Sequence, residues 1–234
     1  MENSSTRKIK YLTANAMFAA IAFVSVVVFR ISGIGGFLTM DIKDAIMTVA
    51  AMYFGPFSAI LLSVAVSLIE LTVSGTGIYG LIMNILGSVA FTFTASLIYK
   101  YKKTFLGAIA GLISGCFVMV ACMLLANLFI TPYYMGMSAS DVAGMIPTLL
   151  LPFNVAKGVL NAAITLLLYK PISRVLRRFG FGKTPVSSGK EHDPNKNHNR
   201  SVAVFVVSII IIAAALYIIL TVLGGNAIFF GTLK

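Results

Sequence analysis

The stretch "LPFNVAKGVLNAAITLLLYK", residues 151–170, decides the fold of this chain. An apolar run of this length is what an α-helix needs to cross the hydrocarbon core of a bilayer. The run nevertheless begins with Asn154, Lys157 and Asn161, whose spacing of i, i+3 and i+7 places them on one face of a helix. Polar side chains within a membrane span usually face a cavity or a partner. The stretch therefore predicts a membrane helix with a functional face.

The composition supports a membrane protein. Of the 234 residues, 59% are hydrophobic and only 11% are charged, whereas ordinary globular domains carry roughly 25% charged residues. Cys116 and Cys122 lie in one apolar run and are predicted to be small core residues, with no disulfide or metal role. The first apolar run is too long for a signal peptide, and no small-residue cleavage site follows it.

The remaining apolar runs predict an all-α integral membrane bundle. Its six helices are expected at about 11–31, 43–54, 57–74, 79–99, 105–130 and 148–170, with a seventh membrane helix at about 202–223. Glycines break the helix in the loop 32–42, and the loop 131–147 is predicted to hold a short surface helix. The predicted organisation is an N-terminus (1–10), a six-helix membrane domain (11–173), a basic linker (174–201), the seventh helix and a tail (224–234).

Basic residues predict the orientation. They cluster before the first helix, after the fourth and between the sixth and the seventh, three places that lie on one side if six helices alternate. Because basic loops stay in the cytoplasm, the N-terminus and the linker are predicted to be cytoplasmic and the tail to be outside. The loops 32–42 and 131–147 then face outward.

The sequence offers no pattern typical of an enzyme. "GFGKT" at 180–184 lacks the earlier glycine of a phosphate-binding loop, because Arg177 stands at that position. The two histidines, His192 and His198, both lie in the hydrophilic linker, and no paired carboxylates within the spans suggest a metal site. We expect no catalysis, no metal and no ATPase in this chain.

Polar residues gather instead near the predicted outer helix ends, among them Asn84, Asn127, Asn154 and Lys157. They indicate a pocket that opens outward. Apolar and aromatic side chains are available as its walls, and the candidates are Phe37, Leu38, Met40, Tyr133, Tyr134 and Phe153.

Several of these stretches together resemble the S components, the substrate-binding subunits, of energy-coupling factor vitamin transporters, most closely the riboflavin-specific ones. The resemblance covers residues 10 to about 178 and is carried by "GFLTMDIKDAIM", "YFGPFSAIL", "GLIMNILGS" and "LPFNVAKGVLNAAITLLLYKPIS". The "PFNVAKG" segment is its most specific element. The resemblance implies that Asn127, Asn154 and Lys157 hold a flavin ring.

The resemblance also implies a substrate-capture subunit that binds riboflavin from outside as its transported ligand, with no cofactor. Its expected partners are a transmembrane coupling subunit and two cytoplasmic ATPase subunits. The small residues Ala16 and Ala20 on the first helix are candidates for docking the coupling subunit, with internal packing as the alternative. Glu70 departs from the pattern of the riboflavin members, and it could instead pair with Lys43 or Lys157.

Other interpretations remain open for the individual residues and for the whole chain. Lys157 could extend to the outer interface, and the asparagines could bond neighbouring helices or cap them. The ligand could be another vitamin or a precursor. The chain could also be a structural or regulatory membrane protein without a ligand.

Overall fold

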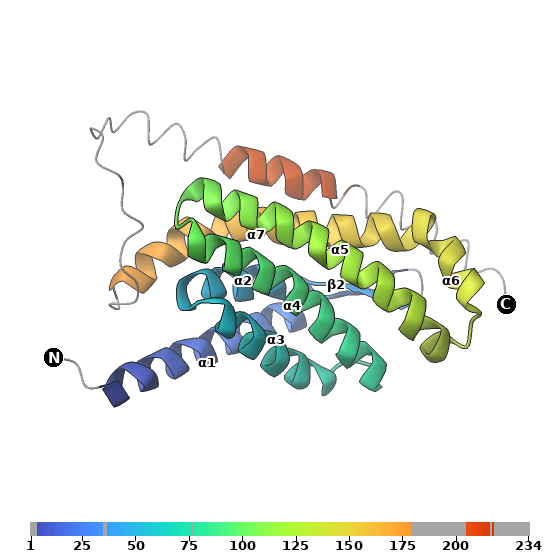
Figure 1. Ribbon diagram of the computed structural model, residues 1–234, viewed down its shortest axis with the longest axis horizontal. Coiled ribbons are helices and arrows are strands. Elements are labelled where there is room, and N and C mark those ends of the chain that lie inside the picture. The colour runs from blue at the N-terminus through green and yellow to red at the C-terminus, as the bar shows by residue number, and fades with distance from the viewer. Residues whose placement is uncertain (1–3, 35–36, 76, 179–204, 216, 218–234) are drawn as a thin grey trace.

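The structure, a computed structural model, describes residues 4–34, 37–75, 77–178, 205–215 and 217 (Figure 1). It confirms the all-α fold class, with a small two-stranded sheet as an addition. The elements are α1 (Ser4–Phe29), β1 (Ile31–Ile34), β2 (Leu38–Met40), α2 (Lys43–Phe54), α3 (Pro56–Leu71), α4 (Gly77–Tyr101), α5 (Phe105–Met135), α6 (Ala139–Met145), a π-helical turn (Ile146–Leu150) and α7 (Leu151–Arg178). A further helix, Phe205–Ala215, is called the C-terminal helix below.

Within these described residues, four helical segments are long and apolar enough to cross a membrane. They are Lys8–Phe29, Gly77–Tyr101, Phe105–Met135 and Ala139–Leu176. Their outward faces carry large apolar side chains, such as Phe117 and Phe129, which are 74% and 71% exposed. Lipid is the solvent in which such faces are stable, because it removes apolar area from water.

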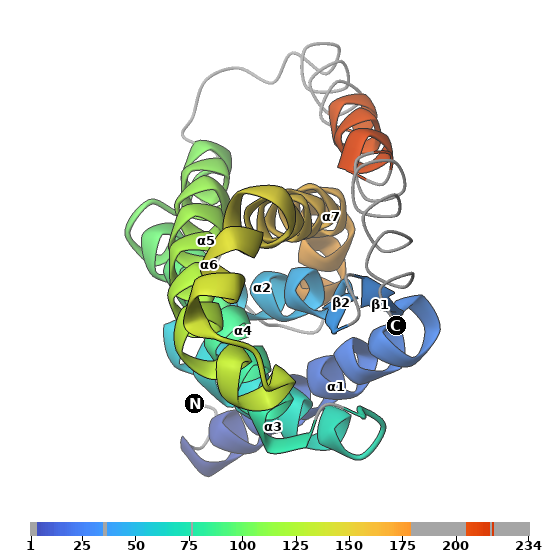
Figure 2. The same ribbon diagram turned by 90° about the vertical axis from the view of Figure 1, so that its right-hand side faces the viewer.

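The short helix α2 lies in the middle of the bundle, in contact with α1, α3, α4 and α7 (Figure 2). Ten of its 12 residues are buried, including Lys43 and Asp44 at its first turn. α2 ends at Gly55, whose φ of +102° is a conformation that glycine adopts without a steric penalty, and Pro56 starts α3. The break predicted at "FGPF" is therefore confirmed, and it returns the chain toward the hairpin end.

Close packing of α4 on α5 fixes one wall of the bundle. A Cβ atom at Gly111 would lie 2.6 Å from the carbonyl oxygen of Ala95, and one at Gly115 would lie 2.8 Å from that of Phe91. Both contacts are with backbone atoms, which cannot move aside as a flexible side chain does. The glycines thus set the distance between the two helices.

The glycine-rich loop 32–42 contains more structure than the sequence predicted. β1 and β2 form an antiparallel hairpin in which Ile31 pairs with Met40 and Ser32 pairs with Thr39. A hairpin satisfies the backbone polar groups of a segment that glycine prevents from being helical. Its inner residues Ile34, Leu38 and Met40 are buried.

Several predicted helix ends were wrong. α5 does not stop before Pro132 but continues to Met135, where Gly136 has φ +65° and ends the helix. A proline removes one intrahelical hydrogen bond, a loss that buried membrane helices tolerate when neighbouring groups compensate. α1 begins before residue 11 and ends at Phe29.

Other predicted boundaries also differ from those of the structure. The predicted surface helix exists as α6, which starts with a capping box formed by Ser138 and Asp141. The π-helical turn leads from α6 into α7, and α7 extends through Pro171 into the segment predicted to be linker. The rest of that linker, 179–201, and the tail 224–234 lie outside the described residues, as do both ends of the predicted helix 202–223.

Candidate functional site

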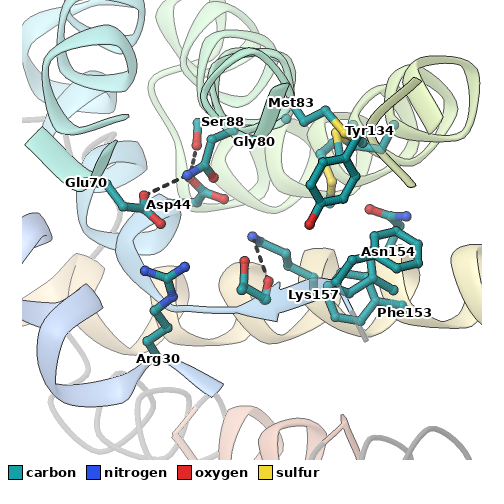
Figure 3. A pocket seen from close by; sticks show the side chains of 17 residues that line it. Arg30, Asp44, Glu70, Gly80, Met83, Ser88, Tyr134, Phe153, Asn154 and Lys157 are labelled. Carbon is teal, nitrogen blue, oxygen red and sulfur yellow. Dashed lines mark hydrogen bonds between the residues drawn. The ribbon is translucent and has the colours of Figure 1, made fainter. Parts of the chain in front are cut away.

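A cavity lies at the hairpin end of the bundle, between the hairpin, α3, α4, α5 and α7 (Figure 3). Seven of the ten predicted site residues line it: Phe37, Leu38, Asn84, Tyr134, Phe153, Asn154 and Lys157. Its volume is about 80 Å³, less than the roughly 300–1,000 Å³ of typical ligand pockets. A vitamin-sized ligand therefore requires the cavity to open.

A buried ion pair lies against the cavity, which its acidic member Glu70 lines. Lys43 on α2 pairs with Glu70 on α3, and both side chains are at most 2% exposed. Asn84 on α4 joins the pair, because its Oδ1 accepts from Lys43 Nζ at 2.8 Å and its Nδ2 donates to Glu70 Oε2 at 2.7 Å. The predicted pairing of Glu70 with Lys43 is confirmed. The three residues tie three helices together.

A second ion pair joins α7 to the hairpin. Lys157 Nζ lies 2.9 Å from Asp41 Oδ2 and 3.4 Å from the carbonyl oxygen of Thr39. Burial alone would raise the pKa of Asp41, but the ammonium groups of Lys157 and Lys43 outweigh it and hold the pKa below its ordinary value. Asp41 is therefore ionised. Its other oxygen, Oδ1, is buried without a hydrogen bond to any described residue.

Asn161 on α7 bonds to the backbone of Asp41 and to the first turn of α2. Its Nδ2 donates to the backbone oxygen of Asp41 at 3.1 Å, and its Oδ1 accepts from the backbone N–H of Ala45 at 3.0 Å. That N–H belongs to the first turn of α2, where backbone donors have no partner within the helix. Asn161 thus holds the start of α2 against α7. It does not line the cavity.

Arg30 was not predicted as a site residue. It follows α1, and its side chain points into the cavity opposite Tyr134 (Figure 3). Its Nε is buried and has no hydrogen bond to the described part of the chain. The signal in the sequence was an arginine at the end of an otherwise apolar run, a position that an interfacial anchor would also occupy. The acidic Asp44 on the same wall is held by the Ser88 hydroxyl, which donates to it at 2.6 Å.

The other wall is aromatic. Phe37 and Tyr134 meet edge to face with ring centroids 6.4 Å apart, and Phe153 lies beside them with 3% exposure. These rings come from the hairpin, α5 and α7 respectively. Aromatic rings on one side with amides and cations on the other suit a flat ligand with a polar edge.

Three predicted residues do not line the cavity. Tyr133 is 80% exposed on the outside of α5, and Met40 is buried in the apolar cluster behind the hairpin. Asn127 is fully buried, where it donates to the Met123 carbonyl at 2.7 Å and accepts from the Thr131 hydroxyl at 2.9 Å. The neighbour of Tyr133, Tyr134, does line the cavity, because adjacent helical residues point in directions about 100° apart.

Asn154 does line the cavity, and its Nδ2 donates to the Leu150 carbonyl at 2.8 Å. Ala16 and Ala20, the predicted docking residues, are exposed on α1. Among the described residues no group of three histidine, cysteine or acidic side chains could hold a metal ion.

Comparisons with known proteins agree on the kind of molecule. Residues 10–172 match the family described as "ECF transporter, substrate-specific component". The riboflavin transporter RibU of Staphylococcus aureus (strain TCH60) is 30% identical over 176 residues, which cover 72% of this chain and 93% of that protein. The riboflavin transporter FmnP of Bacillus subtilis (strain 168) is 24% identical over 173 residues, or 69% of this chain and 91% of that protein.

The fold comparison agrees as well. A solved structure of the S component of a bacterial ECF transporter is similar with a TM-score of 0.63 and 31% sequence identity. The similarity covers 73% of this chain and 99% of that one. The unmatched part of this chain includes the C-terminal helix, since the family match ends at residue 172.

Proposed function

We propose that this chain, which belongs to the family of ECF transporter substrate-specific components, captures riboflavin at the outer face of the membrane for import. Members of this family are multi-pass membrane subunits that bind the substrate and are not enzymes. Riboflavin as the ligand is supported by relatives that are 24–30% identical and are named riboflavin transporters.

The observation that carries the proposal is the pairing of Asn154 and Lys157 on one face of α7, within a cavity that aromatic side chains line. A flavin ring has a flat apolar body and an edge with carbonyl oxygens, ring nitrogens and one imide N–H. An amide offers both a donor and an acceptor to such an edge, and an ammonium group serves its acceptors. The rings of Phe37, Tyr134 and Phe153 suit the flat faces.

Ligand entry in this proposal takes place through the hairpin. Phe37, Leu38 and Thr39 line the cavity from the hairpin side, so moving the hairpin enlarges the cavity. Such a segment acts as a lid that opens to admit the ligand and closes over it. The lid would face outward if the exposed basic residues at the end of α4 and just after it, Lys100, Lys102 and Lys103, stay in the cytoplasm. The N-terminus then lies in the cytoplasm, and the C-terminus outside.

In our proposal, the energy for import comes from other subunits. We propose that a transmembrane coupling subunit and two cytoplasmic ATPase subunits provide it. The exposed Ala16 and Ala20 on α1 are the proposed contact, because small residues let a second helix approach closely within lipid.

The direct test is a titration of the purified protein with riboflavin, in which binding is measured as quenching of riboflavin fluorescence. We expect saturable quenching that Asn154→Ala and Lys157→Ala weaken and that a matched change at an exposed lysine outside the cavity, Lys102→Ala, leaves unchanged. Absence of quenching in the wild-type protein would refute riboflavin as the ligand. Thermal stabilisation by another vitamin, and not by riboflavin, would identify a different substrate for the same pocket.

A further inference from the structure

The C-terminal helix packs on the bundle through one face. Ser208 and Ala215 are 1% and 3% exposed, and Ile212, between them, is partly buried. These positions follow the i, i+4, i+7 spacing of a single helix face. The other side carries large exposed residues such as Phe205 and Ile210 (57% and 61%). The helix therefore has one face against protein and one face suited to lipid.

The buried face contacts the apolar cluster that backs the hairpin. Ala215 and Ile212 belong to the same cluster as Ile34 and Leu38 of the hairpin and Phe153 of α7. Leu38 and Phe153 also line the cavity. The cluster thus backs the cavity wall at Leu38 and Phe153, and the C-terminal helix packs in this cluster without lining the cavity itself. Figure 2 shows this helix beside α7.

We propose that the C-terminal helix is a clamp that holds the hairpin closed over the cavity and thereby slows the entry and release of the ligand. The helix lies beyond residue 172, where the family match ends, so family membership assigns it no role. The proposal rests on the proposed function for the identity of the ligand and for the hairpin as its lid.

The physical argument concerns what opening must expose. The cavity of about 80 Å³ requires the hairpin to move before a vitamin-sized ligand fits. Moving Ile34 and Leu38 out of the cluster exposes apolar surface, which opposes opening. Each side chain of the C-terminal helix that packs in the cluster adds to the surface that opening exposes. The Lys157–Asp41 pair holds the hairpin from α7, and the C-terminal helix adds a second restraint.

Two alanines on the C-terminal helix give a matched test in the full-length protein. Ala215 is buried in the cluster, whereas its neighbour Ala214 is exposed. We expect Ala215→Trp to push the helix from the cluster, and Ala214→Trp to leave it in place. Both proteins, reconstituted in lipid nanodiscs, are compared with wild type for hydrogen exchange in the hairpin peptide 31–40 and for the rate of riboflavin release.

For Ala215→Trp only, we expect faster exchange in the hairpin and about tenfold faster release of riboflavin. The reason is that forcing a large side chain into a packed site weakens the packing by about a factor of ten in the equilibrium constant. Ser208→Leu, which alters the same buried face, is a second variant that should act likewise if Ala215→Trp fails to fold. If Ala215→Trp or Ser208→Leu folds and hydrogen exchange in the hairpin is unchanged, the clamp is overturned. It is also overturned if Ala214→Trp raises hairpin exchange as much as Ala215→Trp does. If the wild-type protein does not bind riboflavin but exchange rises only in the buried-face variants, the clamp stands and the proposed ligand is wrong.

Discussion

Lys157, in the second turn of α7, is paired with Asp41, the residue that follows β2, at a distance of 2.9 Å. The polar residues on this face of α7 therefore have two roles, one at the cavity and one in holding neighbouring elements. Lys157 closes the hairpin onto α7 and also lines the cavity, while Asn161 fixes the start of α2. A ligand that bonds to Lys157 would act on the residue that holds the lid.

Substitutions at Lys157 distinguish its ion pair with Asp41 from its contact with the ligand. Lys157→Met leaves the Asp41 carboxylate buried without its partner, so we expect the free energy of unfolding to fall by about 3–5 kcal/mol. The double variant Lys157→Met/Asp41→Asn removes both charges and should regain most of that stability. Riboflavin affinity should stay low in both variants, as measured by fluorescence quenching. Recovery of affinity in the double variant would show that Lys157 acts only as a structural partner.

The Lys43–Glu70 ion pair predicts an effect on the melting temperature. Glu70→Gln leaves Lys43 charged and fully buried, and the melting temperature should drop by several degrees, since about 1 kcal/mol corresponds to a few degrees in a domain of this size. Glu70→Gln/Lys43→Met should recover that loss. The exposed Lys102→Met provides the control, with a change within the error of a thermal melt. An unchanged melt for Glu70→Gln would mean that the pair does not support the fold.

Arg30 tests the other side of the cavity. Since its Nε bonds to no described residue, Arg30→Gln should leave the melting temperature unchanged. It should weaken riboflavin binding by about 10- to 100-fold, because one charge-assisted hydrogen bond contributes about 1.5–3 kcal/mol. Arg30→Lys, which keeps the charge but not the planar fork, should recover only part of the affinity. Equal affinity in all three proteins would place Arg30 outside the binding site.

Packing of α4 against α5 predicts a stability effect remote from the ligand. Gly111→Ala places a methyl group 2.6 Å from a backbone oxygen, so the helices must separate, at a cost of about 1–3 kcal/mol. Gly144→Ala on α6 meets no atom within 4 Å and serves as the control. Thermal unfolding in detergent distinguishes them. A loss of stability in the control as large as that in Gly111→Ala would refute packing as the cause.

The helices were predictable because membrane spans need long apolar runs, and such runs are visible without any tertiary information. Asn154 and Lys157 both line the cavity, and their common helix face was predictable because their spacing alone fixes it; that they bind a ligand stays a prediction. Their partners were not predictable, since the pairing of Lys157 with Asp41 depends on how the hairpin folds back.

The errors share a physical cause. Pro132 predicts a helix end in water, yet α5 continues, and this continuation is what places Tyr134 at the cavity and Tyr133 outside. Arg30 was not predicted, because the sequence does not show that the chain turns into β1 just after it. In each case the outcome depends on contacts between elements that lie far apart in the chain.

Covalent connection gives the C-terminal helix a property that a separate subunit would lack. Because Phe205–Ala215 belongs to the same polypeptide as the hairpin it packs near, its effective concentration at that surface is set by the tether and not by the amount of protein in the cell. The kinetics of the lid should therefore be the same at every expression level. They can change through the lipid, the ligand, the proposed coupling subunit or the chain itself.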